Sequence, residues 1–353
     1  MSQHFATIFV DREVADHPRL ELILKAISFD RKVEVVGETH PGGGLLITRN
    51  RGKFIKPCPG QKGSVCCGYW VVEWGLGCPF QCEYCIIQNY LPARDLTLFI
   101  NWEDCLEEIR ELRSRLNGPI RLGTGQFGDP LALEEFFPLN RYLLENTMDI
   151  EDLLIEIKSK SDRIDLLPDV SSPENIVVAF SLNPSDIVSR VEHGTASLQA
   201  RIAAAKIAVG RGFRVAFHFD PLLPVNGWEM AYRSVVESLA GIPVDQIAWF
   251  SLGTFRFPVG FPERVLACHP KTTLFREEFH PSFDGKIRMF RPYREEVYKV
   301  VKECIDETLG EVHLYLCMES PHVWERVWGE MWSSAKLKHW LDSSIAKFHG
   351  NRL

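Results

Sequence analysis

The sequence has few of the features that mark membrane, secreted or fibrous proteins. It contains no stretch of about 18 uncharged apolar residues, so we expect no transmembrane helix. The first residues, MSQHFATIFVDREVAD, have neither the basic segment nor the apolar run of a secretory signal. Internal repeats and low-complexity segments are also lacking. We therefore expect a globular, cytoplasmic protein without a membrane partner.

Positive charge is scarce as well. The 353 residues include 40 Lys and Arg against 47 Asp and Glu, which gives a formal net charge of −7. A uniformly basic nucleic-acid-binding protein is therefore not expected, although a local basic face fits this total. The chain length allows roughly two domains or one large α/β barrel. Ten cysteines in a cytoplasmic protein more often bind metal or take part in chemistry than form disulfides.

Short apolar runs alternate with longer helical patterns along most of the chain. The expected strands are Val71–Gly75, Ile120–Gly123, Leu153–Ile157, Ile176–Leu182, Phe213–Phe219, Gln246–Leu252 and His313–Met318. The expected helices are Trp102–Leu116, Leu133–Glu145, Ser197–Gly210, Trp228–Leu239 and Tyr293–Leu309. Repeated strand–helix units predict a parallel sheet, either doubly wound or bent into a barrel, and six units fit a partial barrel better than a full barrel of eight.

The two ends of the chain follow other patterns. Short strands at Phe5–Val10, Val33–Val36 and Leu45–Thr48 surround a helix near Leu20–Ala26, and Trp324–Leu353 is helical and amphipathic. A connector rich in Gly and Pro runs from Arg51 to Gly68. We therefore expect an α/β fold in three parts. These are a small N-terminal α/β subdomain with its connector at 1–68, the partial barrel at 69–259, and a C-terminal region with a hairpin and helices at 260–353.

The most informative motif is Cys78-Pro-Phe-Gln-Cys82-Glu-Tyr-Cys85, directly after the first expected barrel strand. Three thiolates at this C-x3-C-x2-C spacing can ligate three irons of a [4Fe–4S] cluster. The fourth iron would keep an open position that can chelate a substrate or cofactor. The alternatives are a structural zinc site or cysteines without a shared role. Zinc usually needs a second pair of ligands, and none follows at the normal distance. The motif therefore favours an iron–sulfur cluster.

This loop resembles the radical S-adenosylmethionine (SAM) superfamily, in which an aromatic residue precedes the third cysteine, as Tyr84 does here. The resemblance implies a [4Fe–4S] cluster whose open iron binds SAM, and reductive cleavage to a 5′-deoxyadenosyl radical that abstracts hydrogen. It assigns Tyr84 to the catalytic and SAM-binding site. It also implies a partial (β/α)6 barrel and an electron donor such as flavodoxin or ferredoxin.

Gly123-Thr-Gly-Gln-Phe-Gly128 follows the second expected barrel strand and matches the dinucleotide-binding pattern G-x-G-x-x-G. That interpretation is weak, because Pro130 follows at once and no βαβ unit opens the chain. In a radical SAM barrel the same segment lies near the methionine amino group, which implies SAM contacts at Gly123, Thr124 and Gly125. Both interpretations rest on backbone that approaches a ligand closely.

Polar residues also occur at the ends of successive expected strands, where a barrel holds its site. Each alone is more simply a capping, solvated or core residue, but together they favour a site. They are Lys158, Lys160, Ser181, Asn183, His218, Asp220, Ser251 and Arg256.

A closer resemblance, to the spore photoproduct lyase family, covers most of the chain. It rests on Cys82-Glu-Tyr-Cys-Ile-Ile-Gln88, Lys160…Asp165-Leu-Leu, Phe180-Ser-Leu-Asn183, Glu192-His-Gly-Thr195, Arg201-Ile-Ala-Ala-Ala205, Gly227-Trp-Glu-Met-Ala-Tyr-Arg233 and Arg256-Phe257. That family reverses a thymine–thymine UV lesion in DNA. The resemblance implies that Lys160, Ser181 and Asp220 lie along bound SAM, and we add Asn183 to this set.

Two departures from the family concern the return of a hydrogen atom to the product radical. Gln126 stands where the lyases carry a hydrogen-donating cysteine, and Ile86 stands where they carry a tyrosine. Cys317, at a late strand end, is a candidate substitute donor, although a buried structural cysteine is the simpler interpretation. A radical SAM enzyme with a different substrate is therefore the main alternative. A non-enzymatic DNA-binding or iron–sulfur regulator is a weaker one, since a regulator would not need a SAM site.

Three further features remain outside the resemblance. Cys58, Cys66 and Cys67 form either an auxiliary metal site with a distant cysteine such as Cys317, or a redox pair or surface thiol. Two basic runs, Arg49–Lys62 and Lys286–Arg294, are candidate contacts to damaged DNA. Phe290 or Tyr293 in the second run would stack on a base, whereas a solvated charged loop is an equal alternative.

Overall fold

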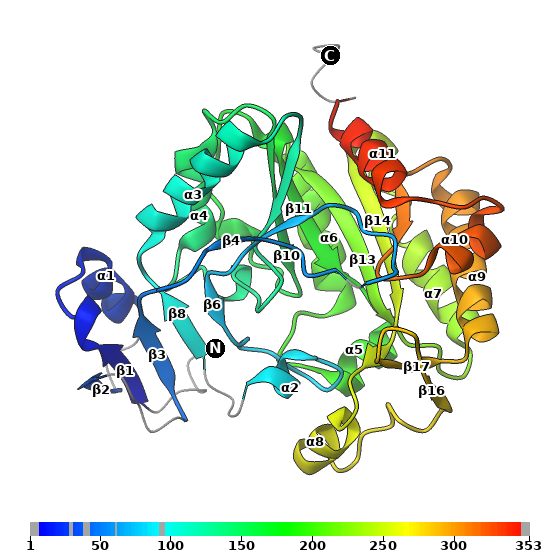
Figure 1. Ribbon diagram of the computed structural model, residues 1–353, viewed down its shortest axis with the longest axis horizontal. Coiled ribbons are helices and arrows are strands. Elements are labelled where there is room, and N and C mark those ends of the chain that lie inside the picture. Colours follow the sequence, from blue (N-terminus) through cyan, green and yellow to red (C-terminus); the bar gives the residue numbers. More distant parts are fainter. Residues whose placement is uncertain (1–6, 28–30, 38–42, 61, 92–95, 347–353) are drawn as a thin grey trace.

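The computed structural model describes residues 7–27, 31–37, 43–60, 62–91 and 96–346 (Figure 1). Parts of two predicted elements, residues 5–6 of the first strand and residues 347–353 of the last helical segment, lie outside the described residues.

An N-terminal five-stranded sheet has the order β2-β1-β3-β8-β6. Its strands are β1 (Thr7–Asp11), β2 (Lys32–Val36), β3 (Leu45–Thr48), β6 (Gly75–Leu76) and β8 (Leu96–Phe99). Four of them are parallel, and β6 runs antiparallel to β8. Helix α1 (Pro18–Ala26) buries Leu20 and Ile23 in the core. Because β6 and β8 follow residue 68, this sheet crosses the boundary predicted there.

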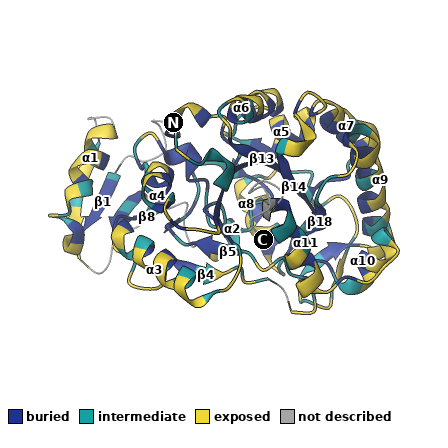
Figure 2. Cartoon of the chain, turned by 90° about the horizontal axis from the view of Figure 1, so that it is seen from above, coloured by how far each residue is buried: buried dark blue, intermediate teal, exposed yellow. Residues whose placement is uncertain are grey.

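The main sheet has eight strands in the order β18-β14-β13-β11-β10-β9-β5-β4. The strands are β4 (Ile55–Pro57), β5 (Trp70–Val72), β9 (Ile120–Gly123), β10 (Leu153–Ser159), β11 (Ile176–Ser181), β13 (Arg214–Leu222), β14 (Ile247–Thr254) and β18 (Leu314–Leu316). All neighbours pair in parallel except β4, which runs antiparallel to β5 at one edge. The sheet curls into a half-barrel, and helices surround its buried strands (Figure 2).

The segment predicted as one barrel strand, Val71–Gly75, is divided between the two sheets. β5 belongs to the main sheet and β6 to the N-terminal sheet. A Cβ atom at Gly75 would lie 2.3 Å from the carbonyl oxygen of Thr97, so β6 approaches β8 closely only because position 75 is glycine. The prediction of a single strand is therefore wrong beyond Val72.

Helices cover the outer face of the half-barrel and leave their own outer surfaces exposed (Figure 2). They are α3 (Trp102–Arg115), α4 (Leu139–Thr147), α5 (Ser185–Val191), α6 (Leu198–Gly210), α7 (Trp228–Glu237), α9 (Arg291–Leu309), α10 (Pro321–Trp328) and α11 (Ser334–Ala346). Helix α6 begins where predicted, because the Ser197 hydroxyl accepts a hydrogen bond from the backbone N–H of Ala200. Helix α4 begins later than the predicted Leu133, because Pro138 interrupts the backbone hydrogen bonds.

The crossover between β10 and β11 contains no α-helix, unlike the regular unit of a (β/α)6 barrel. Two 3-10 turns, η3 (Ile164–Leu166) and η4 (Pro173–Asn175), replace it. Pro168 and Pro173 lack the N–H groups that a helix would need there. The other 3-10 turns are η1 (Arg12–Val14), η2 (Leu131–Leu133) and η5 (Val244–Gln246).

Smaller elements lie near the carboxyl ends of the barrel strands. They are β7 (Gln81–Cys82), α2 (Ile87–Tyr90), β12 (Glu192–His193), β15 (Arg256–Phe257), α8 (Phe261–Cys268), β16 (Phe279–Pro281) and β17 (Ile287–Met289). β7 pairs with β12, whereas β16 and β17 form the predicted hairpin and add to β15. Among the described helices, none is both long and apolar enough to cross a membrane.

Candidate active site

A cavity of about 620 Å³ lies at the carboxyl ends of the barrel strands. This is the end at which α/β barrels carry their sites. Of the eight polar residues predicted to converge at strand ends, seven line this cavity. They are Lys158, Lys160, Ser181, His218, Asp220, Ser251 and Arg256.

The cysteine loop forms one wall of the cavity. The pairing of β7 with β12 fixes one part of the loop, and the start of α2 fixes its end. The backbone N–H of Cys85 donates to the carbonyl of Cys82 at 3.0 Å, and the side-chain amide of Gln88 donates to the same carbonyl at 2.8 Å. Cys78, Cys82 and Cys85 all line the same cavity.

The arrangement of the three thiols does not match the coordination of one metal ion by all three. Thiolates around one tetrahedral zinc ion lie about 4 Å apart. Within the part of the chain that the structure describes, the three ligand groups that lie within 4.8 Å of one another are Glu83, His193 and His269, and no set of three cysteines does. Burial raises the pKa of all three loop thiols, so they are protonated without metal and release protons when they bind it.

Tyr84 connects the cysteine loop to a buried ion pair. Its hydroxyl donates to Oε1 of Glu192 at 2.5 Å, and Oε2 of Glu192 lies 2.6 Å from the guanidinium of Arg201. Burial alone would raise the pKa of Glu192, but Arg201 and Lys160 lower it below its ordinary value. The Tyr84 ring lines the cavity and lies 5.6 Å from the Lys160 ammonium.

Asp129, in the segment after β9, holds that segment to the end of β10 at the cavity. Its carboxylate accepts hydrogen bonds at 2.7 Å from the Ser159 hydroxyl and from the backbone N–H of Lys160. Asp129 lines the cavity but was not among the predicted site residues.

The glycine-rich segment contributes less to the cavity than predicted. Gly125 lines it, but Gly123 and Thr124 are not among the lining residues. A Cβ atom at Gly123 would lie 1.3 Å from the Tyr69 hydroxyl, so this glycine makes room for that ring. The buried Thr124 hydroxyl donates to Asn140 at 3.2 Å. Both residues therefore lie behind the cavity wall, and their SAM contacts stay predictions from the sequence.

Ser181 lines the cavity, whereas Asn183 does not. Ser181 ends β11 at the cavity. Asn183 instead donates to Glu192 at 2.9 Å and accepts from the Tyr232 hydroxyl at 2.7 Å, and it is not among the lining residues. Asn183 therefore belongs to the network around Glu192, and its cofactor contact stays a prediction from the sequence.

Asp220 and Arg256 form a two-point ion pair in the cavity wall, with distances of 2.9 and 3.2 Å. Burial would raise the pKa of Asp220, but Arg256 lowers it to about 2. The same guanidinium lies 3.8 Å from the sulfur of Cys317. Cys317, the candidate hydrogen donor, lines the cavity, and burial raises its pKa to about 12.

Glu156 is a cavity residue that sequence reasoning missed. Oε1 lies 2.7 Å from Nε2 of His218 and accepts a hydrogen bond from the Trp249 indole at 3.3 Å. Burial would raise the pKa of Glu156, but His218, Lys158 and Tyr69 lower it to about 2. Side chains two residues apart in a strand share a face, so the position of Lys158 was a usable signal for Glu156.

Both departures from the lyase pattern also line the cavity, at Gln126 and Ile86. Cys58 and Cys67 line it too. A hydrogen bond from Cys67 lowers the pKa of Cys66 to about 6. No three of these cysteines and Cys317, all of which are described, lie within 4.8 Å of one another, so this arrangement does not favour a single-ion auxiliary site.

The first basic run, Arg49–Lys62, is largely neutralised. Four of its five basic side chains form ion pairs with acids from other segments. The pairs are Arg49–Asp104, Arg51–Glu13, Lys53–Glu108 and Lys56–Glu73.

The second basic run, Lys286–Arg294, is only partly available to a ligand. Arg288 is buried against Asp284 at 2.5 Å, and Arg294 is buried against Glu319 at 3.1 Å. Neither guanidinium is exposed to a ligand, so the structure does not support the predicted DNA contacts of these two arginines. Phe290 is 58% exposed, and Arg291 is exposed as well.

Comparison with known proteins gives consistent results for sequence and fold. The spore photoproduct lyase of Geobacillus sp. (strain Y412MC61) is 22% identical over 215 residues, which are 59% of this chain and 63% of that protein. The lyase of Bacillus subtilis (strain 168) is 23% identical over 214 residues, which are again 59% of this chain and 63% of that protein. These alignments thus span less than two thirds of each relative.

Solved structures show the same curled parallel sheet. A spore photoproduct lyase complexed with dinucleoside spore photoproduct gives a TM-score of 0.77 at 19% identity, over 88% of this chain and 98% of that one. A lyase variant with bound AdoMet and dinucleoside spore photoproduct gives a TM-score of 0.77 at 18% identity. That match covers 89% of this chain and 100% of the variant. The family model described as spore photoproduct lyase matches residues 63–310, which is more than half of the chain. The chain therefore belongs to the spore photoproduct lyase family.

Proposed function

We propose that this chain is a radical SAM enzyme that acts on a pyrimidine dimer in DNA. The observation that carries the proposal is the shared cavity, which the three thiols of the C-x3-C-x2-C loop and the polar strand ends line together. Family membership supports the same reaction class. When bound, a [4Fe–4S] cluster and SAM would supply a 5′-deoxyadenosyl radical for hydrogen abstraction.

The residues of this chain bind and orient those groups. Cys78, Cys82 and Cys85 are the proposed cluster ligands. The proposed SAM contacts are Tyr84, Gly125, Lys160, Ser181 and Asp220, all of which line the cavity. The hydrogen bond from Tyr84 to Glu192 would hold the loop in position while ligands exchange.

We assign the return of the hydrogen atom to Cys317. A donor of a hydrogen atom must carry its proton, and burial keeps Cys317 in the S–H form at neutral pH because its pKa is about 12. The S–H bond would break, the product radical would gain the hydrogen atom, and a thiyl radical would remain on Cys317. Gln126 cannot serve, because an amide is a poor hydrogen-atom donor.

A second candidate function is a radical SAM reaction on a different substrate. Two observations favour it: Gln126 lines the cavity in place of the lyase cysteine, and acids neutralise most of the basic charge predicted to bind DNA. The cytoplasmic location and the flavodoxin or ferredoxin donor stay predictions from the sequence.

The test is anaerobic turnover of a dinucleotide that contains spore photoproduct, with reconstituted protein, SAM and dithionite. The proposed function predicts thymines as the product. It also predicts that Cys317→Ala still forms 5′-deoxyadenosine but loses most repair, whereas Cys304→Ala, a buried thiol of α9, keeps both activities. Unchanged lesion beside rapid formation of 5′-deoxyadenosine would favour the second candidate.

A further inference from the structure

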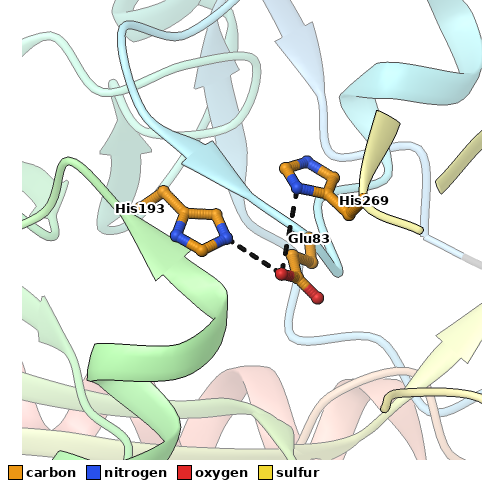
Figure 3. Close-up of side chains that lie close together, drawn as sticks. All are labelled: Glu83, His193 and His269. Carbon is orange, nitrogen blue, oxygen red and sulfur yellow. Dashed lines mark hydrogen bonds and ion pairs between the residues drawn. The ribbon is translucent and has the colours of Figure 1, made fainter. Parts of the chain in front are cut away.

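Three side chains behind the cysteine loop form a second group of metal ligands (Figure 3). Glu83 lies in the loop between two cluster cysteines, His193 lies on β12, and His269 follows α8. Oε1 of Glu83 is 2.9 Å from Nε2 of His193 and 3.8 Å from Nδ1 of His269. One ligand atom from each residue lies within 4.8 Å of the other two.

This group is separate from the cavity. Cys82, Tyr84 and Cys85 line the cavity, whereas Glu83, His193 and His269 are not among its lining residues. The loop therefore presents thiols on one side and a carboxylate on the other. A ligand of the carboxylate side would not compete with the cluster for the same atoms.

The charge on Glu83 is incompletely compensated by the contacts of the folded chain. The residue is 6% exposed, and its Oε2 atom is buried without a hydrogen-bond partner. The contact with His193 accounts for Oε1 only. Burial of an unpaired carboxylate oxygen costs free energy, and a bound cation would remove that cost.

The geometry is close to that of one coordinated ion. Ligand atoms about 2.0–2.1 Å from a shared ion lie roughly 3–3.5 Å apart. The distances of 2.9 and 3.8 Å lie on either side of that range. The imidazole rings of His193 and His269 are also close, with centroids 5.3 Å apart.

We propose that Glu83, His193 and His269 bind a divalent transition-metal ion of the zinc type. Two imidazole nitrogens and one carboxylate oxygen form a ligand set that zinc and similar ions use. The His193 side chain is 40% exposed, which leaves one side of the site open to water as a fourth ligand.

A bound ion would connect three segments that are far apart in the sequence. The cysteine loop and β12 are already joined by strand pairing. The ion would add the end of α8, which packs beside α2. It would thus hold the segment after β15 against the loop that carries the cluster cysteines. This role does not depend on the proposed substrate.

The experiment measures metal content in the cluster-loaded protein. The protein is equilibrated with Zn²⁺, desalted and analysed for zinc and iron by mass spectrometry. We expect about one zinc ion per chain in addition to the cluster iron. His193→Ala and His269→Ala should each weaken zinc binding by roughly 100-fold or more, because each removes a direct ligand. Their iron content should stay unchanged.

His322→Ala is the matched control, since His322 lies 3.8 Å from Glu325 on the surface but is not in the group of three. It should keep its zinc. Zinc K-edge absorption should show nitrogen and oxygen ligands without sulfur. Zinc should also raise the melting temperature of the wild type more than that of His269→Ala. Equal zinc content in wild type and both histidine variants, or sulfur ligands at the zinc, would overturn the proposal.

Discussion

Single residues around the cavity decide its shape and its reactivity. Gly123 leaves the space that the Tyr69 ring occupies, although the sequence suggested a cofactor contact there. Glu156 is ionised in a buried position because His218, Lys158 and Tyr69 surround it. Each property depends on a few named side chains, so single substitutions test it.

Gly123→Ala should destabilise the protein. The new Cβ atom would lie 1.3 Å from the Tyr69 hydroxyl, so the ring must move away from Glu156. Overpacking of this kind costs about 1–3 kcal/mol of the free energy of unfolding, which urea denaturation measures. Gly210→Ala, at the end of α6 with no atom within 4 Å of the new Cβ, should be neutral or slightly stabilising. Equal effects of the two substitutions would contradict the packing argument.

Cys66 should be the thiolate of its cysteine group at neutral pH. The hydrogen bond from Cys67 lowers its pKa to about 6, so alkylation by iodoacetamide should rise with pH and reach half its maximum near pH 6. Peptide mass spectrometry after short exposures gives the rate at each pH. Cys67→Ala removes the bond and should move the midpoint to higher pH. An unchanged midpoint in that variant would rule out the hydrogen bond as the cause.

At the scale of elements, the cysteine loop depends on the short pairing of β7 with β12. Both strands are only two residues long, and the Glu192–Arg201 ion pair beside them is fully buried. Glu192 also accepts from Tyr84 and Asn183. The position of the loop therefore depends on a charge network outside the loop itself.

Glu192→Gln should destabilise the fold and reduce iron incorporation. It leaves Arg201 buried without a counter-charge, which costs about 3–5 kcal/mol. Because the folded pKa of Glu192 lies below its ordinary value of 4.5, the wild type should keep this advantage above about pH 4.5 and lose it as pH falls further. Urea unfolding at several pH values and iron analysis measure both effects.

Glu111→Gln is the control for this substitution, since Glu111 forms an exposed pair with Arg115 within α3. Such pairs contribute about 0.3–0.5 kcal/mol. A Glu192→Gln variant as stable as this control at pH 7 would mean that the buried network does not hold the loop.

Elements with a strong local pattern were predicted well. Ile120–Gly123 and Leu45–Thr48 agree with the structure at both ends, because turn residues such as Gly118, Pro119 and Asn50 flank these short, mostly apolar segments. The short strands β4, β7 and β12 were missed, because two or three residues carry no periodicity and their pairing depends on distant segments. The division of Val71–Gly75 between two sheets was missed for the same reason.

For the whole molecule, site residues at the carboxyl ends of parallel strands were easier to predict from the sequence than their partners from other segments. The ends of parallel strands meet at one edge, so Lys158, His218 and Arg256 could be brought together without a structure. Partners from other segments could not be foreseen. Arg288 and Arg294 looked like DNA contacts in the sequence, and only the fold reveals Glu319 beside both.

For the proposed DNA substrate, we expect contact at Phe290 and Arg291, the exposed residues at the end of the hairpin and the start of α9. Arg291→Glu together with Phe290→Ala should weaken binding of a damaged duplex and lower its salt dependence, because one phosphate contact and one stacking ring are lost. Fluorescence anisotropy at several salt concentrations measures both. A double substitution at the distant exposed pair Glu21 and Lys25 is the control. Unchanged affinity in the Phe290 and Arg291 double variant would mean that these residues do not contact DNA.

The central claim is that the cysteine loop and the strand ends form one radical SAM site. The most direct measurement is the formation of 5′-deoxyadenosine by the anaerobic, cluster-reconstituted protein with SAM and dithionite. We expect steady formation in the wild type and none in Cys82→Ala, which lacks one of the proposed cluster ligands. A wild-type protein that holds a full cluster but forms no 5′-deoxyadenosine would contradict it.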